Sequence, residues 1–265
     1  MTLFPWDAET LWQDLEPLAP GLSVEVLAET DSTNTHLMER ARRGDTLPCL
    51  LVATCQRAGR GRLGRPWWSQ PGQSLTFSLG LRLAPTDWSG LSLAVGLALA
   101  EALGEHTGLK WPNDLWLRGD DRKLGGILVE VAPLAEPGLR PGERWVVIGA
   151  GLNVAPLPDG QASADPFRTG YACLQEFEPL LTPPQLLHRV ARPLLEAVLA
   201  FETDGLSPRL RTRYAARDVL AGRTVQAGSV TGVACGLSVD GSLQVRDAHG
   251  TVHALHSGEV SVRPC

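Results

Sequence analysis

The stretch between residues 57 and 68 concentrates residue types that suit an anionic substrate. It reads GRGRLGRPW over residues 59–67, and Arg57 precedes it. Four closely spaced guanidinium groups repel one another unless an anion lies between them, and guanidinium pairs with the two oxygens of a carboxylate or phosphate. Repeated glycine lets the backbone approach a ligand, and Trp67 and Trp68 offer flat faces for stacking on a base. The stretch predicts an anion-binding loop. The alternatives are a solvated loop and an RNA-binding Gly-Arg segment.

Two further stretches place lysine, amide and carboxylate groups in rigid or buried surroundings. In KWPND, residues 110–114, Pro112 holds its neighbours extended, which brings the three polar side chains near one turn. In KLGGILVE, residues 123–130, a lysine opens an otherwise apolar strand, and the two glycines permit close approach of a ligand to the backbone. The ordinary alternatives are a structural turn and a solvated lysine.

The stretches DSTN and GAGLN complete the set of candidate binding segments. DSTN, residues 31–34, stands at a predicted helix start, where such residues cap the helix and free N–H groups can also meet a polar ligand. GAGLN, residues 149–153, leaves room against a strand, and Asn153 offers both a donor and an acceptor to a purine edge. Neither a Walker loop nor a dinucleotide fingerprint is present.

Periodicity predicts the elements that position these stretches. Helices are predicted over residues 7–16, 33–43, 87–106, 182–203 and 206–216, and strands over 22–28, 49–54, 74–83, 114–117, 124–132 and 144–154. The Pro/Gly-rich segment 133–143 predicts a hairpin loop. From about residue 217 short alternating strands are separated by Gly-containing turns, among them Asp240-Gly241, which predicts a small β-barrel.

Composition restricts the class of protein. The chain has 265 residues, 43% hydrophobic and 20% charged, with a formal net charge of -5, which argues against a general nucleic-acid binder. Five cysteines without CxxC spacing disfavour a disulfide framework or a zinc site and favour a reducing cytosol. The N-terminus lacks a signal-peptide pattern, and no apolar stretch reaches membrane-spanning length. We therefore expect a cytoplasmic protein that binds neither DNA nor membrane.

Together, in this order and spacing, DSTN, GRGRLGRPW, KWPND, KLGGILVE and GAGLN resemble the biotin protein ligase family. The resemblance runs from about residue 29 to 154 and continues more weakly to SGEVSVR, residues 257–263, which is similar to the end of the family's SH3-like domain. It implies an α+β fold, a mixed β-sheet flanked by helices of the class II aminoacyl-tRNA synthetase and biotin ligase type, with a small C-terminal SH3-like β-barrel. The implied division is an N-terminal extension (1–22), a catalytic domain that binds biotin and ATP (23–217) and the SH3-like domain (218–265).

The resemblance also implies the reaction and its residues. Biotin and Mg-ATP would form biotinyl-5′-AMP, and biotin would then pass to a lysine of the biotin carboxyl carrier protein of acetyl-CoA carboxylase. The implied catalytic residues are Arg60, Lys123 and Asp114, with Asp114 orienting or deprotonating the acceptor amine. Biotin would be bound by Ser32, Thr33, Asn34, Gln56, Gly59, Arg60, Arg62, Lys123 and Gly125. ATP would be bound by Arg62, Arg65, Trp67, Asn113, Lys123 and Asn153, and Mg²⁺ would be held mainly by the phosphates.

Several alternatives stay open at this point. A lipoate–protein ligase or octanoyl transferase shares this fold, although GRGRLGRPW together with KWPND favours biotin. A non-enzymatic nucleic-acid binder and an inactive family member are the other two readings. About 30 residues precede DSTN, too few for a three-helix DNA-binding module, so a ligase without repressor activity is expected. A homodimer is left open.

Overall fold

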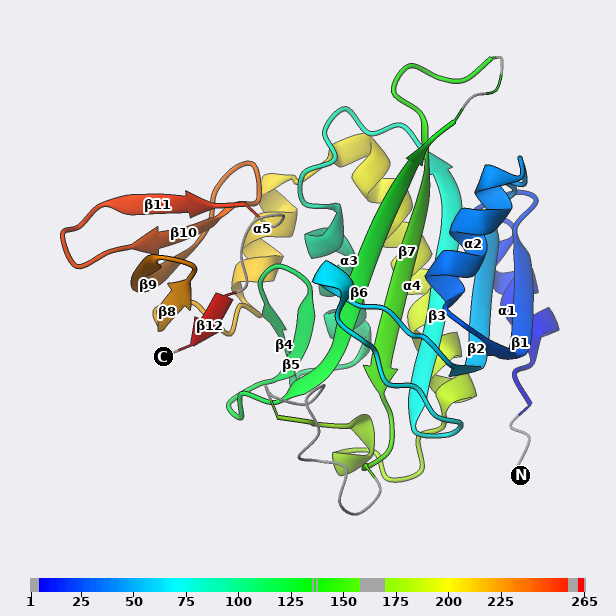
Figure 1. The fold of residues 1–265 in the computed structure, drawn as a ribbon, viewed down its shortest axis with the longest axis horizontal. Coiled ribbons are helices and arrows are strands. Elements are labelled where there is room, and N and C mark those ends of the chain that lie inside the picture. The colour runs from blue at the N-terminus through cyan, green and yellow to red at the C-terminus, as the bar shows by residue number, and fades with distance from the viewer. Residues whose placement is uncertain (1–4, 135, 137, 158–169, 257–261, 265) are drawn as a thin grey trace.

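A seven-stranded mixed sheet forms the larger part of the computed structural model, which describes residues 5–134, 136, 138–157, 170–256 and 262–264. Its strand order is β1-β2-β3-β7-β6-β5-β4, and β1 and β2 are parallel while the other neighbours are antiparallel (Figure 1). The strands are β1 Ser23–Thr30, β2 Cys49–Gln56, β3 Ser74–Leu83, β4 Thr107–Lys110, β5 Asp114–Leu117, β6 Lys123–Pro133 and β7 Arg144–Asn153. The predicted mixed sheet flanked by helices is confirmed.

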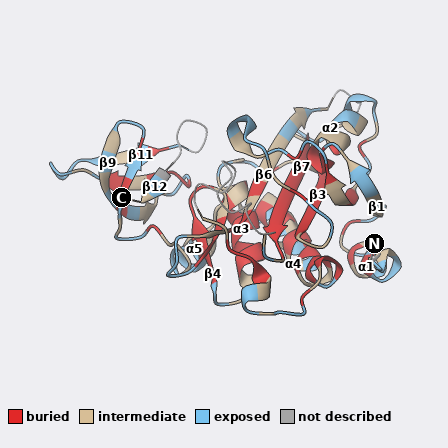
Figure 2. Ribbon diagram, turned by 60° about the horizontal axis from the view of Figure 1, so that its bottom comes forward, coloured by how far each residue is buried: buried red, intermediate tan, exposed pale blue. Residues whose placement is uncertain are grey.

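Helices cover both faces of this sheet. In Figure 1, α2 lies on the near face, and α3 and α4 lie on the far face, where buried residues are most concentrated (Figure 2). The helices are α1 Ala8–Leu15, α2 Thr33–Arg42, α3 Leu91–Ala102, α4 Pro183–Asp204 and α5 Pro208–Ala215, with short 3₁₀ turns η1 Arg62–Gly64 and η3 Leu174–Glu176. Because both faces are covered, a strand such as β2 is apolar and buried from Cys49 to Ala53. Its Leu50 and Val52 pack into the large core, and its Cys49 and Leu51 pack against α2.

The central strands β3 and β7 carry different residues on their two faces. On β3, Leu75, Phe77 and Leu79 belong to the core beneath α3 and α4, whereas the alternate residues Thr76 and Ser78 face the side of α2. On β7, Ile148 and Ala150 belong to the core and alternate with Gly149 and Gly151. Small and polar residues thus leave open space on the α2 side of the middle of the sheet, and the site lies there.

The C-terminal part forms a separate five-stranded antiparallel sheet. Its order is β11-β10-β9-β8-β12, with β8 Thr224–Ala227, β9 Val230–Leu237, β10 Leu243–Arg246, β11 Val252–Leu255 and β12 Val262–Pro264. Asp240 and Gly241 lie in the turn between β9 and β10, as predicted, with Gly241 at a φ of 79°. The predicted small C-terminal domain of short β-strands is confirmed by this sheet, and among the described residues its edge strands β11 and β12 do not pair with each other. Trp111 donates its indole N–H to Gly241 O over 3.0 Å, which joins the two parts.

One predicted helix is shorter in the structure, one strand was not predicted, and the C-terminal motif lies partly outside the described residues. The helix predicted over 87–106 is the shorter α3, because Gly90 and Gly104 adopt φ values of 90° and 93° at its two ends. The short strand β4 was not predicted, since four residues show no clear period. Of SGEVSVR, residues 257–261 lie outside the described residues, and the domain boundaries at 22 and 217 stay a prediction. Among the described residues no helix is long and apolar enough to cross a membrane.

Asp218, at the junction between α5 and the small sheet, gives a pH-dependent prediction. Burial raises its pKa to about 6, while its carboxylate accepts the N–H of Leu220 over 2.9 Å. Because this folded-state pKa lies above the ordinary value of about 3.9, the stability contributed by Asp218 is complete below pH 4 and is lost as the pH rises through 6. We expect Asp218→Asn, which stays neutral, to raise Tm by roughly 2–4 °C at pH 8 and by less at pH 4.5.

Thermal melts at the two pH values measure this effect. The matched control is Asp87→Asn at an exposed position, and its change in Tm should be the same at both pH values. Equal changes in Tm at pH 4.5 and pH 8 for Asp218→Asn would argue against a buried, protonatable carboxyl.

Candidate active site

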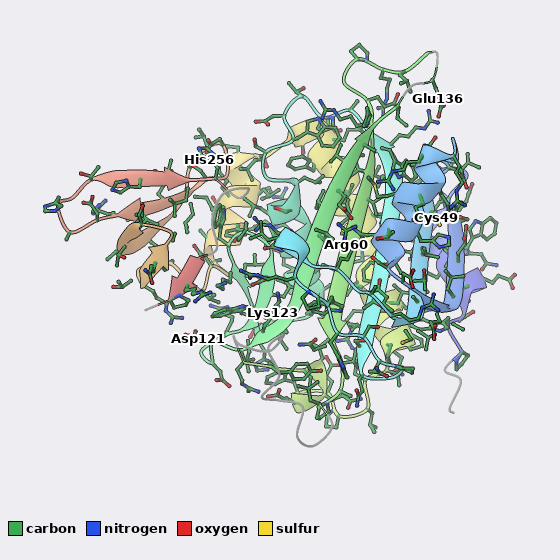
Figure 3. The ribbon with its side chains drawn as sticks, in the orientation of Figure 1. Cys49, Arg60, Asp121, Lys123, Glu136 and His256 are labelled. Carbon is green, nitrogen blue, oxygen red and sulfur yellow. The ribbon has the colours of Figure 1, made fainter. Side chains whose placement is uncertain are left out.

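A cavity of about 510 Å³ opens on the α2 side of the large sheet. This volume suits a small-molecule ligand. The start of α2, the Gly-Arg loop, the KWPND turn and the ends of β6 and β7 all contribute to it. Arg60 and Lys123 both line it and lie on the same side of the sheet in Figure 3. The predicted site residues that line the cavity are Ser32, Thr33, Asn34, Gln56, Arg60, Arg62, Arg65, Trp67, Asn113, Asp114, Lys123 and Asn153.

Gly59 and Gly125, also predicted to bind biotin, do not line the cavity. A Cβ at Gly59 would lie 2.4 Å from the carbonyl oxygen of Trp67, and one at Gly125 would lie 2.7 Å from that of Gly151. These glycines therefore let neighbouring backbone segments pass close together. Their effect on a ligand would be indirect, through the shape of the wall.

Among the described residues, Asp114 is the one carboxylate that lines the cavity, and cationic groups surround it. Lys123 Nζ lies 2.6 Å from Asp114 Oδ1, and Lys110 Nζ lies 3.6 Å from Asp114 Oδ2. Burial alone would raise the pKa of Asp114, but the charges of Lys123 and Lys110 hold it below its ordinary value. Asp114 is thus ionised at neutral pH. Since Arg60, Arg62 and Arg65 also line the cavity, positive charge prevails there and favours anionic ligands.

Lys110 was not among the predicted site residues, yet it lines the cavity and is buried. Its ammonium lies 4.9 Å from the centroid of the Trp116 ring, and burial lowers its pKa. The sequence held a signal: the chain contains two lysines among its 24 basic residues, and both line this cavity. A chain that uses arginine at every other basic position retains lysine where a compact point charge is needed.

The Gly-Arg loop is tied to the KWPND turn through Arg62. Its guanidinium donates to Asn113 Oδ1 over 3.0 Å, and Asn113 Nδ2 donates to Ile127 O over 2.6 Å. Burial lowers the pKa of Arg62. The contact places a loop cation beside Asp114 and holds the loop over the cavity.

Polar side chains at the start of α2 form the other end of the cavity. Ser32 caps the helix through its hydroxyl, which accepts the N–H of Thr35 over 3.4 Å. Thr33 donates its backbone N–H to Gln56 Oε1 over 2.7 Å. Asn34 donates both hydrogens of its amide, to Leu128 O and to the carboxylate of Glu130. Asn34 therefore offers a ligand its carbonyl oxygen at most.

Trp67 and Asn153 lie at the end of the cavity formed by β6 and β7. Trp67 packs against Gly151 and Gly126, where a Cβ would lie 2.3 Å and 3.5 Å from the indole ring. Its indole N–H is buried and has no hydrogen-bond partner among the described residues. Asn153 donates its amide hydrogens to Lys123 O and Ala172 O, each over 3.0 Å. The expectation that Asn153 offers a ligand both a donor and an acceptor is therefore wrong, because only its oxygen is left.

The arrangement suits the joining of two anions, without a protein nucleophile. A carboxylate and a phosphate repel each other strongly where water is excluded, and converging lysine and arginine side chains offset that repulsion. Cys55 does not line the cavity. The part of the chain that the structure describes holds no cluster of three His, Cys, Asp or Glu side chains that could bind a metal.

Known proteins resemble this chain over most of its length. Residues 26–140 match the model of the Biotin/lipoate A/B protein ligase family. The chain is 32% identical over 273 residues to the Biotin--[acetyl-CoA-carboxylase] ligase of Mycobacterium tuberculosis, covering 97% of this chain and 95% of that protein. It is 36% identical over 254 residues to the Bifunctional ligase/repressor BirA of Salmonella typhimurium, covering 91% of this chain and 74% of that protein.

A solved structure shares the fold as well. The biotin protein ligase from Aquifex aeolicus in complex with biotin and ATP superposes with a TM-score of 0.73 at 28% identity, over 91% of this chain and 99% of that chain.

Proposed function

The chain belongs to the biotin protein ligase family, and we propose from this premise that it activates biotin with ATP and attaches the biotin to a lysine of a carrier protein. The observation that carries the proposal is the convergence of Arg60 and Lys123 on one cavity that also holds Asp114. The acceptor is the biotin carboxyl carrier protein of acetyl-CoA carboxylase, the carboxylase named for the Mycobacterium tuberculosis relative.

In the first step, an oxygen of the biotin carboxylate attacks the α-phosphorus of ATP. Pyrophosphate leaves, and biotinyl-5′-AMP forms. Lys123 Nζ lies 2.6 Å from Asp114 and 5.7 Å from the centroid of the Trp67 ring, so its ammonium can move from Asp114 onto the oxygens of the reacting groups. Arg60 is half-exposed and lies 3.7 Å from Glu130, a weak pairing that an anionic substrate can displace. Both cations would stabilise the negative charge that builds on the phosphoryl oxygens.

A magnesium ion would enter with the nucleotide. The described residues hold no preformed cage of carboxylates, and Asp114 already pairs with two lysines. This donor set fits an ion that keeps its phosphate oxygens and waters and touches at most Asp114 and Asn113 from the protein. When bound, it would neutralise phosphate charge.

In the second step, the amine of the carrier lysine attacks the acyl carbon of the adenylate, and AMP leaves. A lysine with a pKa of about 10.4 is almost wholly protonated at pH 7, so the amine must lose a proton before or during attack. Asp114 is ionised and lines the cavity, which makes it the group that orients the amine or accepts its proton.

Lipoate or octanoate is the competing substrate class for this fold. The polar end formed by Thr33 and Gln56 suits a ring that carries hydrogen-bonding groups, whereas lipoate and octanoate have apolar tails. ATP–pyrophosphate exchange with biotin, lipoate and octanoate offered separately and in competition tests the choice. We expect exchange with biotin alone, and exchange that depends on lipoate or octanoate would contradict the proposal.

Asn153 gives a prediction on nucleotide choice. Its free carbonyl oxygen can accept a hydrogen bond from the 6-amino group of adenine, whereas the 6-oxo group of guanine would face it oxygen to oxygen. We expect ATP to have a KM about tenfold lower than purine riboside triphosphate, which lacks the amino group. In Asn153→Ala the two KM values should become equal. A ratio unchanged by the substitution would remove Asn153 from base recognition.

Other properties follow from the proposed function or from the sequence. A reducing cytosol suits the cysteines Cys49, Cys55, Cys173 and Cys235, which are free. The expectation of a ligase without DNA-binding repressor activity stays a prediction, and a homodimer stays open.

A further inference from the structure

Ser78 lies at the centre of a buried hydrogen-bond network beneath the first turn of α2. Its side chain is fully buried on β3, and its Oγ lies 2.7 Å from Thr33 Oγ1 and 2.6 Å from Asn34 Oδ1. Thr33 and Asn34 line the cavity, whereas Ser78 lies behind them. Ser78 can therefore affect a ligand only through these two residues.

The number of hydrogens available on each side chain determines which group donates in each hydrogen bond of the network. The amide hydrogens of Asn34 go to Leu128 O over 3.2 Å and to Glu130 Oε2 over 2.9 Å, so the atom facing Ser78 is the carbonyl oxygen. The single hydroxyl hydrogen of Ser78 must then go to Asn34, since that oxygen is buried and needs a donor. The Ser78 oxygen consequently faces Thr33 as an acceptor.

The network determines which groups the wall presents. The hydroxyl hydrogen of Thr33 has Ser78 Oγ at 2.7 Å and Gln56 Oε1 at 3.1 Å, and both acceptors draw it into the protein. Thr33 thus leaves an oxygen lone pair for the cavity. Gln56 has its Oε1 bound to the N–H of Thr33, so its NH₂ group is the end that is left for a ligand. The wall offers an acceptor beside a donor.

Gly149 makes room for this arrangement. It is the cross-strand partner of Ser78 in the β3–β7 register, and a Cβ there would lie 2.0 Å from Asn34 Oδ1. A distance that short is a clash that Asn34 could escape only by leaving its position. Ser78 supplies the hydrogen bond and Gly149 supplies the space that together hold the Asn34 amide.

We propose that Ser78 is a positioning residue that fixes Thr33 as a hydrogen-bond acceptor, and so matches this end of the cavity to a ring with an N–H next to a carbonyl, as in a cyclic urea. The inference rests on the proposed function, because the cyclic urea in question is the ureido ring of biotin. Ser78 touches neither substrate nor reacting atoms. Its effect is therefore on binding of the ring and leaves the adenylation step itself unchanged.

Ser78→Ala is the direct test. The change leaves Asn34 Oδ1 buried without a donor and leaves the Thr33 hydroxyl with one inward acceptor, the more distant Gln56 Oε1, in place of two. We expect the KM and the calorimetric Kd for biotin to rise about tenfold, with the KM for ATP and kcat within twofold. Gly149→Ala disturbs Asn34 from the opposite strand and should give the same pattern.

Two controls separate positioning from general damage. Thr107→Val removes another buried hydroxyl, one that has no hydrogen-bond partner among the described residues and does not line the cavity, and it should leave all constants within twofold. In a Thr33→Val background, Ser78→Ala should raise the biotin Kd by less than threefold, because the group through which it acts is already absent.

The outcomes are distinct. A biotin Kd within twofold of the parent in Ser78→Ala overturns the inference. So does a parallel loss in the biotin KM, the ATP KM and kcat with a lowered Tm, because that pattern indicates structural damage. If the unsubstituted protein does not bind biotin, both the proposed function and this inference are overturned. If the unsubstituted protein binds biotin normally, the proposed function stands, whatever the result for Ser78→Ala.

Discussion

Replacing Lys123 by methionine should slow the formation of biotinyl-5′-AMP by about 10²–10³-fold, the loss typical when one group that stabilises transition-state charge is removed. Lys123 lines the cavity, lies 2.6 Å from Asp114 and stands 5.7 Å from the centroid of the Trp67 ring. Without its ammonium the carboxylate and the phosphate must approach with less opposing charge, so more of their mutual repulsion remains. Single-turnover formation of the adenylate measures the effect directly.

Two further variants sharpen this experiment. Lys123→Arg keeps the charge but replaces a compact ammonium by a planar guanidinium, so we expect a loss of about tenfold, smaller than that of the methionine variant. Arg118→Met removes a positive charge from an exposed position that does not line the cavity and should change the rate by less than twofold. Adenylate formation by Lys123→Met within threefold of the parent would rule Lys123 out of the first step.

The second large effect is expected for Asp114→Asn in the transfer step. With preformed biotinyl-5′-AMP and carrier, transfer at pH 7 should fall about 100-fold, because the amide cannot accept the proton of the attacking amine. The pKa of Asp114 lies below its ordinary value, since Lys123 and Lys110 outweigh its burial, so the carboxylate is the working form across the neutral range. Adenylate formation should fall less, because the asparagine carbonyl can still accept a hydrogen bond from Lys123.

Asp121→Asn is the matched control for this variant. Asp121 is an exposed carboxylate near the same strand, pairs with Arg223 and does not line the cavity. Its replacement should leave transfer within twofold. Unchanged transfer in Asp114→Asn would assign Asp114 to holding Lys123 and Lys110, and not to the acceptor lysine.

The sequence predicted the large sheet well where a strand is long and its pattern clear. The bounds of β3 at residues 74–83 match the prediction, because a run of apolar residues between turn-forming segments indicates a buried strand. The short strand β4 was missed for lack of length. In the small domain the structure contains the predicted short strands and the predicted Asp240-Gly241 turn, because a turn-forming pair between alternating strands is a strong local signal.

Some residues of the site could be predicted from the sequence, and others could not. Residues within the five motifs could be named because their types and order match a family pattern, and most of them line one cavity. Ser78 could not be predicted from the sequence, because its role depends on contacts with Thr33 and Asn34, which lie more than forty positions away in the chain. Asn153 was correctly placed at the cavity, but the prediction that its amide N–H groups are available to a ligand was wrong. Both N–H groups donate to backbone carbonyls, and only the fold determines where those carbonyls lie.

The measurement that tests the central claim most directly is the mass of a purified biotin carboxyl carrier domain after incubation with this protein, biotin and Mg-ATP. If cations from separate segments converge to join an acid to a nucleotide, the carrier gains the mass of one biotin less one water. Omitting ATP, or replacing Arg60 and Lys123 together, should abolish the gain. A carrier whose mass is unchanged with the intact protein, or unchanged modification after both cations are removed, would contradict the account.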